Sequence, residues 1–200
     1  MSGKRQKTAH KKLRVAIFAS GTGTNAEKII QSKKDWDVGL IVCNKAGAGV
    51  LNIAKTNNID ALLIDKEQFF NGDNYLGVLQ QQQIDFIVLA GFLWKLPLPM
   101  VNAFPKKIIN IHPALLPKYG GKGMYGENVH EAVIAAGETE SGISIHYVDE
   151  IYDHGEIVFQ AKCPVTKDDT PETLAQKIHA LEHQHYPDVI DSLLQKQNPG

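Results

Sequence analysis

The sequence is poor in cysteine, with only Cys43 and Cys163 among its 200 residues. Each lies within an apolar, strand-like run, where a free thiol behaves as a small buried hydrophobe. Two such cysteines cannot assemble a zinc ribbon or a disulfide-rich scaffold. The sequence therefore predicts buried free thiols and a reducing, cytoplasmic location.

Long apolar runs and net charge are also lacking. No stretch approaches the ~18–20 apolar residues of a membrane span, and the N-terminus has no apolar core of a signal peptide. The formal net charge is −1, so bulk electrostatics favours neither nucleic acid nor a membrane surface as a partner. Lysine and arginine gather in residues 1–12, but this polar, aperiodic segment predicts a loose N-terminal tail rather than a nucleic-acid-binding arm.

Apolar, β-rich runs alternate with amphipathic stretches over the first half of the chain. Residues 13–20, LRVAIFAS, are apolar on both faces, which predicts a central strand of a parallel sheet. Further strands are predicted at 38–44, 61–65, 85–91 and 106–112, and helices at 25–34, 48–57, 73–83 and 97–103. Such alternation indicates right-handed βαβ units with helices on both sides of the sheet.

The alternation of strands and helices ends after residue 140. Two strands at 142–149 and 156–165 are separated by a short polar connection, which predicts an antiparallel pair. A long helix over 171–196 begins with Thr170 as N-cap and Pro171 at its first position. We therefore predict one α/β, Rossmann-like domain over residues 13–197, with a mostly parallel central sheet, an antiparallel strand pair near the C-terminal end and a long C-terminal helix.

The segment SGTGTNA, residues 20–26, joins the first strand to the first helix. Glycines allow close backbone approach, and a helix N-terminus offers free N–H groups to a phosphate. The spacing Gly21-x-Gly23-x-x-Ala26 also fits a loose dinucleotide fingerprint, but the second strand ends in Asn44 and Lys45 rather than in an acidic residue. A monophosphate site is favoured over a dinucleotide site, and a purely structural turn remains an alternative.

Residues 108–118, IINIHPALLPK, place an amide and an imidazole at the end of an apolar strand. Because residues i and i+2 of a strand point to the same face, Asn110 and His112 project together. Pro113 and Pro117 then end the strand and stiffen the chain that follows. The carboxyl ends of strands are where open α/β sheets bind their ligands, so this pair is a candidate catalytic site.

Two other groups of titratable residues are open to a structural and a functional interpretation. His179, Glu182 and His183 match the H-x-x-E-H pattern of some zinc proteases, but the match is only three residues long, and we predict no metal.

The segment 147–156 carries four acids, which by composition predicts a solvated loop. The alternative is that one of these carboxylates orients His112 and raises its pKa toward the operating pH.

The chain resembles the glycinamide ribonucleotide formyltransferases of purine biosynthesis from about residue 13 onward. The resemblance lies in RVAIFASGTGTN, CNKAGAG, DFIVLAGFLWKL, IINIHPALLPKYGG, SGISIHYVDEIYDHGEIVFQAKCPV and LEHQHYP. It implies a catalytic trio of Asn110, His112 and Asp153. It also implies substrate contacts from Gly23, Thr24, Asn25 and Glu182, and a folate pocket formed by Leu93, Trp94, Lys95, Leu96, Asn110, Asp149, Glu150, Ile151, Tyr152 and Asp153.

The implied reaction is formyl transfer from 10-formyltetrahydrofolate, as co-substrate, to the amine of glycinamide ribonucleotide. Asn110 would donate to the tetrahedral oxyanion, an oxyanion-hole role that is typically worth ~3–4 kcal/mol. His112, held protonated by Asp153, would support the same oxygen and carry the proton from the amine to the leaving nitrogen. No metal is needed, the partners are small molecules, and the expected state is a monomer or a homodimer.

The chain also departs from this family's commonest pattern at three places. The loop 119–130 is about five residues longer and offers Asn128 and His130 where other members carry two histidines. Trp94-Lys95 replaces an arginine–apolar pair, and an arginine that some members use for the folate tail falls near Gly72. Folate binding is therefore expected to use other contacts in this chain.

Three alternative functions share parts of the pattern. A formyltetrahydrofolate hydrolase has an extra N-terminal domain, for which the twelve residues before Leu13 leave no room. A methionyl-tRNA formyltransferase carries a basic C-terminal domain, whereas this chain stops just past its last predicted helix. A non-catalytic nucleotide-binding module would use the glycine loop but not Asn110 and His112.

Overall fold

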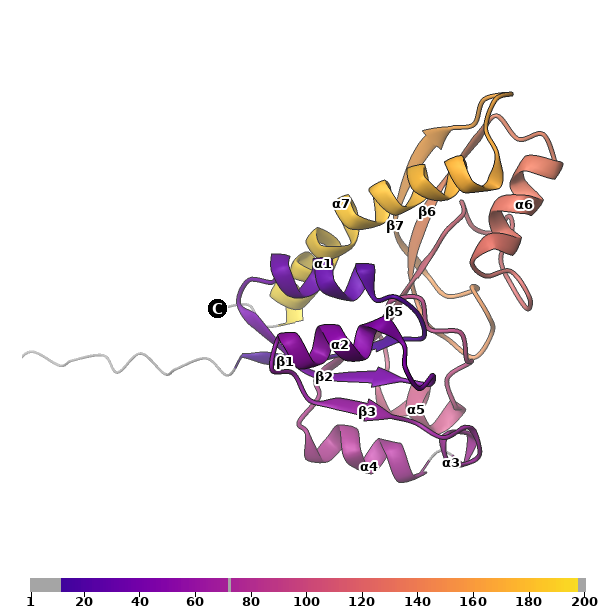
Figure 1. Ribbon diagram of the computed structural model, residues 1–200. Coiled ribbons are helices and arrows are strands. Elements are labelled where there is room, and N and C mark those ends of the chain that lie inside the picture. Colours follow the sequence, from indigo (N-terminus) through magenta and orange to yellow (C-terminus); the bar gives the residue numbers. More distant parts are fainter. Residues whose placement is uncertain (1–11, 72, 198–200) are drawn as a thin grey trace, which may run out of the picture.

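The computed structural model describes residues 12–71 and 73–197, and within them seven strands form one sheet (Figure 1). The strands lie in the order β3-β2-β1-β4-β5-β6-β7. Their bounds are β1 Leu13–Ala19, β2 Trp36–Cys43, β3 Ala61–Leu63, β4 Phe86–Leu89, β5 Ile108–His112, β6 Glu140–Tyr147 and β7 Ile157–Pro164.

Strands β1 to β5 pair in parallel, and β6 and β7 extend the sheet antiparallel to β5 and to each other. The predicted α/β class, the mostly parallel sheet and the antiparallel pair are confirmed. The order of β3-β2-β1 against β4-β5 creates a switch point between β1 and β4, outside whose carboxyl ends open α/β sheets bind ligands. The position of β1 inside the sheet explains why its residues are apolar on both faces.

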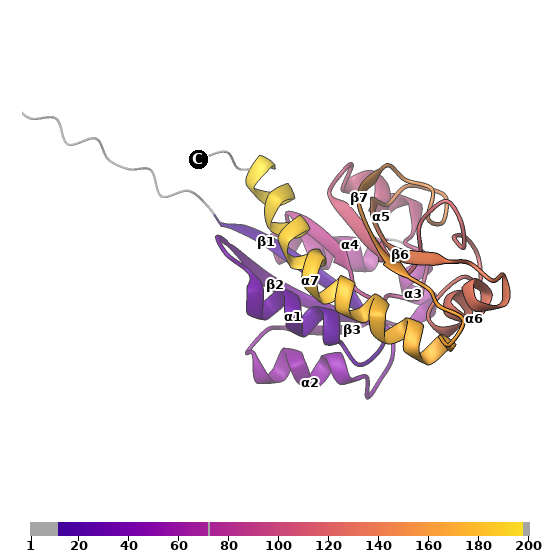
Figure 2. The same cartoon turned by 90° about the horizontal axis from the view of Figure 1, so that it is seen from above.

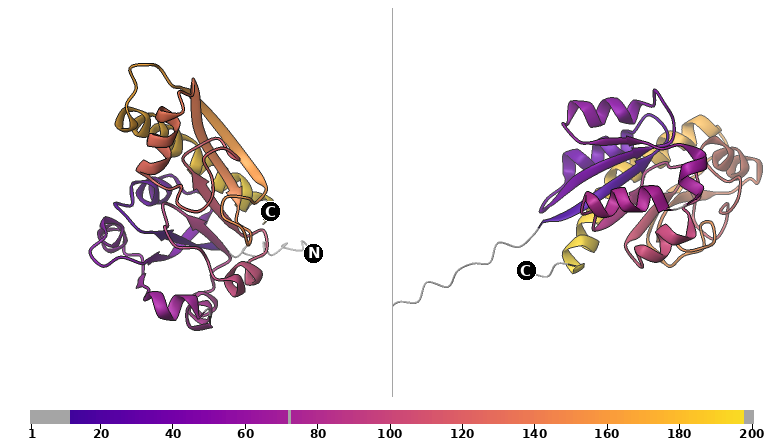
Figure 3. Two further views of the ribbon diagram at one scale, coloured as in Figure 1. Left: turned by 90° about the vertical axis from the view of Figure 1, so that its right-hand side faces the viewer. Right: turned by 90° about the horizontal axis from the view of Figure 1, so that it is seen from below.

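Side chains of successive β1 residues enter two different cores. Val15 and Ile17 belong to a core under α1, α2, α6 and α7, whereas Ala16 and Phe18 belong to a core under α3, α4 and α5. The helices on the first side are α1 Thr24–Ser32, α2 Gly49–Thr56, α6 Glu127–Ala135 and α7 Pro171–Gln197; those on the second side are α3 Lys66–Phe70, α4 Asp73–Gln81 and α5 Leu98–Ala103. Figure 2 shows α7 running alongside α1, and Figure 3 shows helices on both sides of the sheet from two further directions.

Helix α7 begins as predicted and is fixed to the sheet by a buried tyrosine. The Thr170 hydroxyl accepts a hydrogen bond from the Thr173 N–H at 3.3 Å, and Pro171 is the first helical residue. Farther along, the Tyr186 hydroxyl donates to the Leu89 carbonyl at 2.8 Å, at the carboxyl end of β4. This contact brings the preceding turn of α7 close to the switch point of the sheet.

Two helices and one thiol differ from the sequence predictions. Neither α3 nor α6 was expected: α3 is a short helix capped by the Asp65 carboxylate, which accepts from the N–H groups of Glu67 and Gln68, and α6 follows a glycine-rich loop that interrupts the helical pattern. Cys163 is only half-buried, because it lies on the edge strand β7; Cys43 is buried as predicted, and both thiols are free.

Some sequence predictions fall on residues that the structure does not describe. The N-terminal tail predicted over 1–12 lies outside the described residues except for residue 12, and so does the position of Gly72. Within the described part of the chain, no helix is long and apolar enough to cross a membrane.

Candidate active site

A cavity of about 650 Å³ opens at the carboxyl ends of β4 and β5, beside Asn25 in the first turn of α1. Its volume suits a ligand the size of a cofactor or small substrate. Most of the sequence-predicted site residues line it: Asn25, Leu93, Trp94, Lys95, Leu96, Asn110, His112, Asp149, Ile151, Tyr152, Asp153 and Glu182. The remaining predicted residues, Gly23, Thr24 and Glu150, do not line this cavity.

The glycine loop positions the N-terminus of α1 at one end of the cavity. Gly23 has a φ of +85°, and a Cβ added there would lie 2.8 Å from the Val50 Cα, so only glycine fits. Helix α1 begins at Thr24 without a side-chain cap. Its free N–H groups remain available to an anion, as the sequence predicted for a monophosphate.

Asn25 and Glu182 join α1 to α7 across 157 positions of sequence. The Asn25 Nδ2 group donates to Glu182 Oε2 at 2.8 Å. The Asn25 Oδ1 atom is buried and has no hydrogen-bond partner among the described residues. Glu182 is 5% exposed, so its carboxylate is almost fully buried at the surface of the cavity.

The H-x-x-E-H motif is held together by a hydrogen-bonded ion pair. His179 Nδ1 lies 3.0 Å from Glu182 Oε2, and this hydrogen bond, with the carboxylate charge, raises the pKa of His179 against the opposing effect of burial. The Nε2 atom of His183 is buried and has no hydrogen-bond partner within residues 12–71 and 73–197. Among the described residues, no group of three or more His, Cys, Asp or Glu side chains lies close enough to hold a metal ion.

The predicted catalytic trio does come together, from β5 and the loop between β6 and β7. His112 Nδ1 lies 3.6 Å from Asp153 Oδ2, and Asn110 Nδ2 lies 3.5 Å from Asp153 Oδ1. The Gly121 N–H donates to Asp153 Oδ2 at 2.9 Å and fixes the carboxylate. One acid of the acidic loop, Asp153, therefore faces the imidazole, whereas Glu150 is exposed and does not line the cavity.

The hydrogen bonds of His112 determine where its ring takes up a proton. Nε2 lies 2.7 Å from the Tyr119 carbonyl oxygen, which can only accept, so Nε2 carries a hydrogen. The second proton of an imidazolium must then sit on Nδ1, the atom that faces Asp153. The carboxylate thus acts directly on the nitrogen that titrates.

Burial reverses the expected direction of the His112 pKa shift. The side chain is almost fully buried, and this desolvation lowers the pKa of His112 below its ordinary value even though Asp153 and the Tyr119 carbonyl raise it. Asp153 raises the pKa of His112, as predicted, but burial outweighs it, so the net pKa lies below rather than above the ordinary value. Asp153 thus limits how far burial lowers it.

Asp153 stays ionised at neutral pH. Burial raises its pKa, but the hydrogen bond with His146, the charge of His112 and the Gly121 N–H together lower that pKa below the ordinary value for aspartate. The negative charge is therefore present whenever His112 gains or loses its proton.

His146 is a site residue that the sequence reasoning missed. In the register of β5 and β6 it stands opposite Asn110, and its Nε2 lies 3.2 Å from Asn110 Nδ2 and 3.5 Å from Asp153 Oδ1. Because its Nδ1 lies 2.9 Å from the Tyr147 carbonyl, which can only accept, Nδ1 carries a hydrogen; Nε2 then accepts from Asn110 in the neutral ring and donates to Asp153 in the charged ring. His146 therefore orients the Asn110 amide. The sequence does contain a signal for it: Ser144 and His146 are polar residues two apart within the apolar run GISIHYV, so both point to the same face of the strand.

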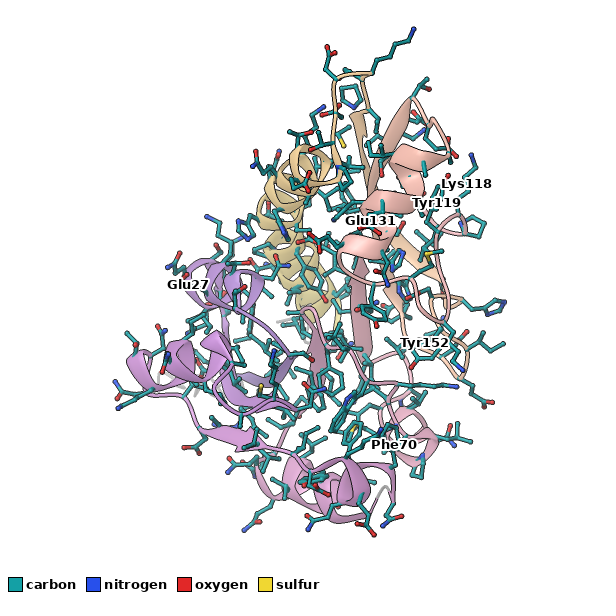
Figure 4. All side chains as sticks on the ribbon, turned by 45° about the vertical axis from the view of Figure 1, so that its right-hand side comes forward. Glu27, Phe70, Lys118, Tyr119, Glu131 and Tyr152 are labelled. Atoms are coloured by element: carbon teal, nitrogen blue, oxygen red, sulfur yellow. The ribbon has the colours of Figure 1, made fainter. Side chains whose placement is uncertain are left out.

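An aromatic and apolar surface forms the opposite side of the cavity. The Trp94 ring lies 5.6 Å from that of Phe69 and 5.8 Å from that of Phe70, between centroids. Lys95 Nζ lies 5.6 Å from the Tyr152 ring centroid, so its ammonium group contacts an aromatic face rather than a carboxylate. Tyr152 and Phe70 lie on the same side of the molecule (Figure 4).

The long loop 119–130 supplies the outer boundary. The Tyr119 hydroxyl and Lys118 Nζ both contact the Glu138 carboxylate, at 2.9 and 2.8 Å, which anchors the start of the loop. Asn128 does not line the cavity, since its amide donates to the Gly123 carbonyl within the loop. His130, the other loop residue singled out in the sequence, does line it.

Comparisons with known proteins agree on one family. Residues 13–190 match the family model described as formyl transferase. The chain is 40% identical over 193 residues to a chloroplastic phosphoribosylglycinamide formyltransferase of Arabidopsis thaliana, covering 92% of this chain and 66% of the plant protein. It is 36% identical to the phosphoribosylglycinamide formyltransferase of Bacillus subtilis, covering 92% of this chain and 96% of that protein.

A solved structure gives the same result for the fold. The phosphoribosylglycinamide formyltransferase of Anaplasma phagocytophilum superposes with a TM-score of 0.85 at 34% identity, over 93% of this chain and 89% of the other. The chain spans about two-thirds of the length of the plant relative.

Proposed function

The chain belongs to the formyl transferase family, and we propose on this basis that it transfers a formyl group from 10-formyltetrahydrofolate to the amine of glycinamide ribonucleotide in purine biosynthesis. The observation that carries the proposal is the meeting of Asn110, His112 and Asp153 in one cavity with the Asn25–Glu182 pair. Asn110, His112 and Asp153 provide the hydrogen-bond donor and the proton carrier that acyl transfer requires. Asn25 and Glu182 would bind a ribonucleotide whose phosphate lies at the N-terminus of α1.

The chemistry follows from the donors at the end of β5. The substrate amine attacks the formyl carbon, and the carbonyl oxygen becomes an oxyanion. The two hydrogens of Asn110 Nδ2 face His146 at 3.2 Å and Asp153 Oδ1 at 3.5 Å, and the hydrogen of the longer contact would turn from Asp153 to donate to that oxygen. When the intermediate collapses, the bond between the formyl carbon and the folate nitrogen breaks, the amine loses one proton and the folate nitrogen gains one.

His112 is the group that carries this proton. Its ring takes up the proton on Nδ1, and the 3.6 Å separation of Nδ1 from Asp153 is longer than a hydrogen bond, so this N–H can donate to the intermediate while Nε2 remains bound to the Tyr119 carbonyl. A histidine with a lowered pKa releases a proton readily, and the ionised Asp153 stabilises the charged form during the transfer.

The two substrates occupy different parts of the cavity in this proposal. The phosphate lies at the N-terminus of α1, near Gly23, Thr24 and Asn25, and Glu182 accepts from a ribose hydroxyl. The folate lies against Leu93–Leu96 and the loop 149–153, where Trp94, Leu96 and Tyr152 offer apolar surface. The site needs no metal for any of these steps.

One assay separates this function from its alternatives. Purified protein is incubated with 10-formyltetrahydrofolate and, in turn, with glycinamide ribonucleotide, charged initiator tRNA or water alone, and tetrahydrofolate release is followed. Release that depends on the ribonucleotide supports the proposal. Release with water alone would identify a hydrolase, release with tRNA a tRNA formyltransferase, and no release a binding module.

The wider setting of the protein is also a proposal. We place it in the cytoplasm, as a monomer or a homodimer with one formyltransferase domain over residues 13–197. The two free thiols, Cys43 and Cys163, support a reducing compartment.

Replacing Asn25 with aspartate tests the phosphate position. The new carboxylate would face both the phosphate and Glu182, so like-charge repulsion should raise KM for the ribonucleotide by ~10-fold or more. KM for 10-formyltetrahydrofolate should change little. Steady-state kinetics with each substrate varied in turn measures both, and an equal rise in the two values would assign the loop a structural role instead.

Chelation tests the H-x-x-E-H motif. His179 Nδ1 is engaged with Glu182 rather than turned toward His183, so dialysis against a strong chelator should leave formyl transfer unchanged. Activity that falls on chelation and returns with zinc would contradict this and revive a metal site at His179, Glu182 and His183.

A further inference from the structure

His130 is a buried imidazole that has no hydrogen-bond partner among the residues that the structure describes. It lies in α6, is 4% exposed, and lines the cavity. Its Nδ1 atom is buried and unpaired, and neither ring nitrogen forms a hydrogen bond with another described residue. Burying such a group without a partner costs free energy, so an unpaired polar group in a cavity surface points to a ligand.

The electrostatic neighbours of His130 show which part of the cavity it faces. Its titration is influenced by His179 and Glu182 on α7 and by His112 on β5. His130, Glu182 and His112 also line the same cavity, and α6 packs against α7, so His130 lies on the side of the cavity that holds the proposed ribose contact and the proposed catalytic imidazole. The folate-lining residues Lys95 and Tyr152 are not among the groups that influence it.

The part of the ribonucleotide between ribose and reacting amine is the glycinamide amide. An amide offers one carbonyl acceptor and one N–H donor. A neutral imidazole offers one N–H donor and one nitrogen acceptor on opposite sides of its ring, so it can form one of the two complementary hydrogen bonds with such an amide. Burial and the neighbouring histidines lower the pKa of His130, so its neutral form prevails at neutral pH.

We infer that His130 binds the glycinamide amide of the ribonucleotide and so places the amine before the formyl carbon. This inference rests on the proposed function and assigns His130 a specificity role within it. Ribose 5-phosphate, which keeps the ribose and phosphate but has no amide, would bind without help from His130.

The test compares two ligands and three variants. His130→Phe keeps a ring of similar size but removes both hydrogen-bonding nitrogens, and His130→Gln restores a donor and an acceptor. Glu131→Gln is the matched control, since this exposed residue is the next position on α6 (Figure 4). Binding of glycinamide ribonucleotide and of ribose 5-phosphate is measured by calorimetry, and KM and kcat by the release assay.

We expect His130→Phe to weaken glycinamide ribonucleotide binding by ~10-fold, with a matching rise in KM. Ribose 5-phosphate binding and KM for 10-formyltetrahydrofolate should stay within twofold, and His130→Gln should recover part of the loss. Equal weakening of both ligands, or no weakening of either, would overturn the inference. Failure of the proposed function would look different, because the wild-type protein would then show no tetrahydrofolate release that depends on glycinamide ribonucleotide, while calorimetry would still report the role of His130.

Discussion

Replacing Asp153 with asparagine is expected to lower kcat for formyl transfer by on the order of 10²-fold or more at neutral pH. The substitution keeps the size of the side chain but removes the negative charge 3.6 Å from His112 Nδ1. That charge is the largest of the effects that oppose burial at His112, so without it the protonated imidazole becomes rarer still. Because the charge matters chiefly in the transition state, KM for either substrate should change much less.

The substitution Asp153→Asn should also shift the pH–rate profile in one direction. The protonated form of His112 supports the oxyanion, so activity that depends on it is present below the pKa of His112 and is lost as pH rises through that pKa. Burial already lowers this pKa below the ordinary value for histidine, and Asp153→Asn lowers it further. The descending side of the profile should therefore move to lower pH in the variant.

Asp168→Asn is the control for this experiment, because Asp168 is exposed in the connection before α7 and lies outside the cavity. It should retain wild-type kcat and the wild-type profile. A profile in Asp153→Asn that coincides with that of the wild type, at nearly unchanged kcat, would make the acidic loop only a solvated surface.

Replacing Asn110 with alanine should lower kcat by ~10²–10³-fold, the usual cost of removing one oxyanion-hole donor. Its Nδ2 group is oriented by His146 and Asp153, so the amide is already directed before substrate arrives. An amide does not titrate, so the descending side of the pH–rate profile should stay where it is in the wild type. This separates the role of Asn110 from that of Asp153.

Asn102→Ala, an exposed position on α5, serves as the control and should behave as wild type. Steady-state kinetics and a thermal melt of each variant show whether a loss of rate accompanies a loss of folding. A rise in KM with kcat unchanged would mean that Asn110 binds a substrate equally in the ground and transition states, and the oxyanion role would be refuted.

The sequence alone determined the architecture, because the signals for it are local. A strand apolar on both faces, such as 13–20, has to lie inside a parallel sheet, and a helix start such as Thr170-Pro171 is encoded by adjacent residues. The pairing of Asn110 with His112 on one face follows from the period of a strand. The helices α3 and α6 were missed, since a five-residue helix and a helix after four glycines give little periodic signal.

Tertiary structure decided everything that depends on neighbours distant in the chain. The position of His146 opposite Asn110 is a matter of antiparallel register, which no local pattern specifies. The contact of Asn25 with Glu182 joins two helices that only folding brings together. The pKa of His112 is lowered because the effect of burial is larger than that of the Asp153 carboxylate. The sequence pointed to this carboxylate, but it does not show how deeply a single side chain is buried.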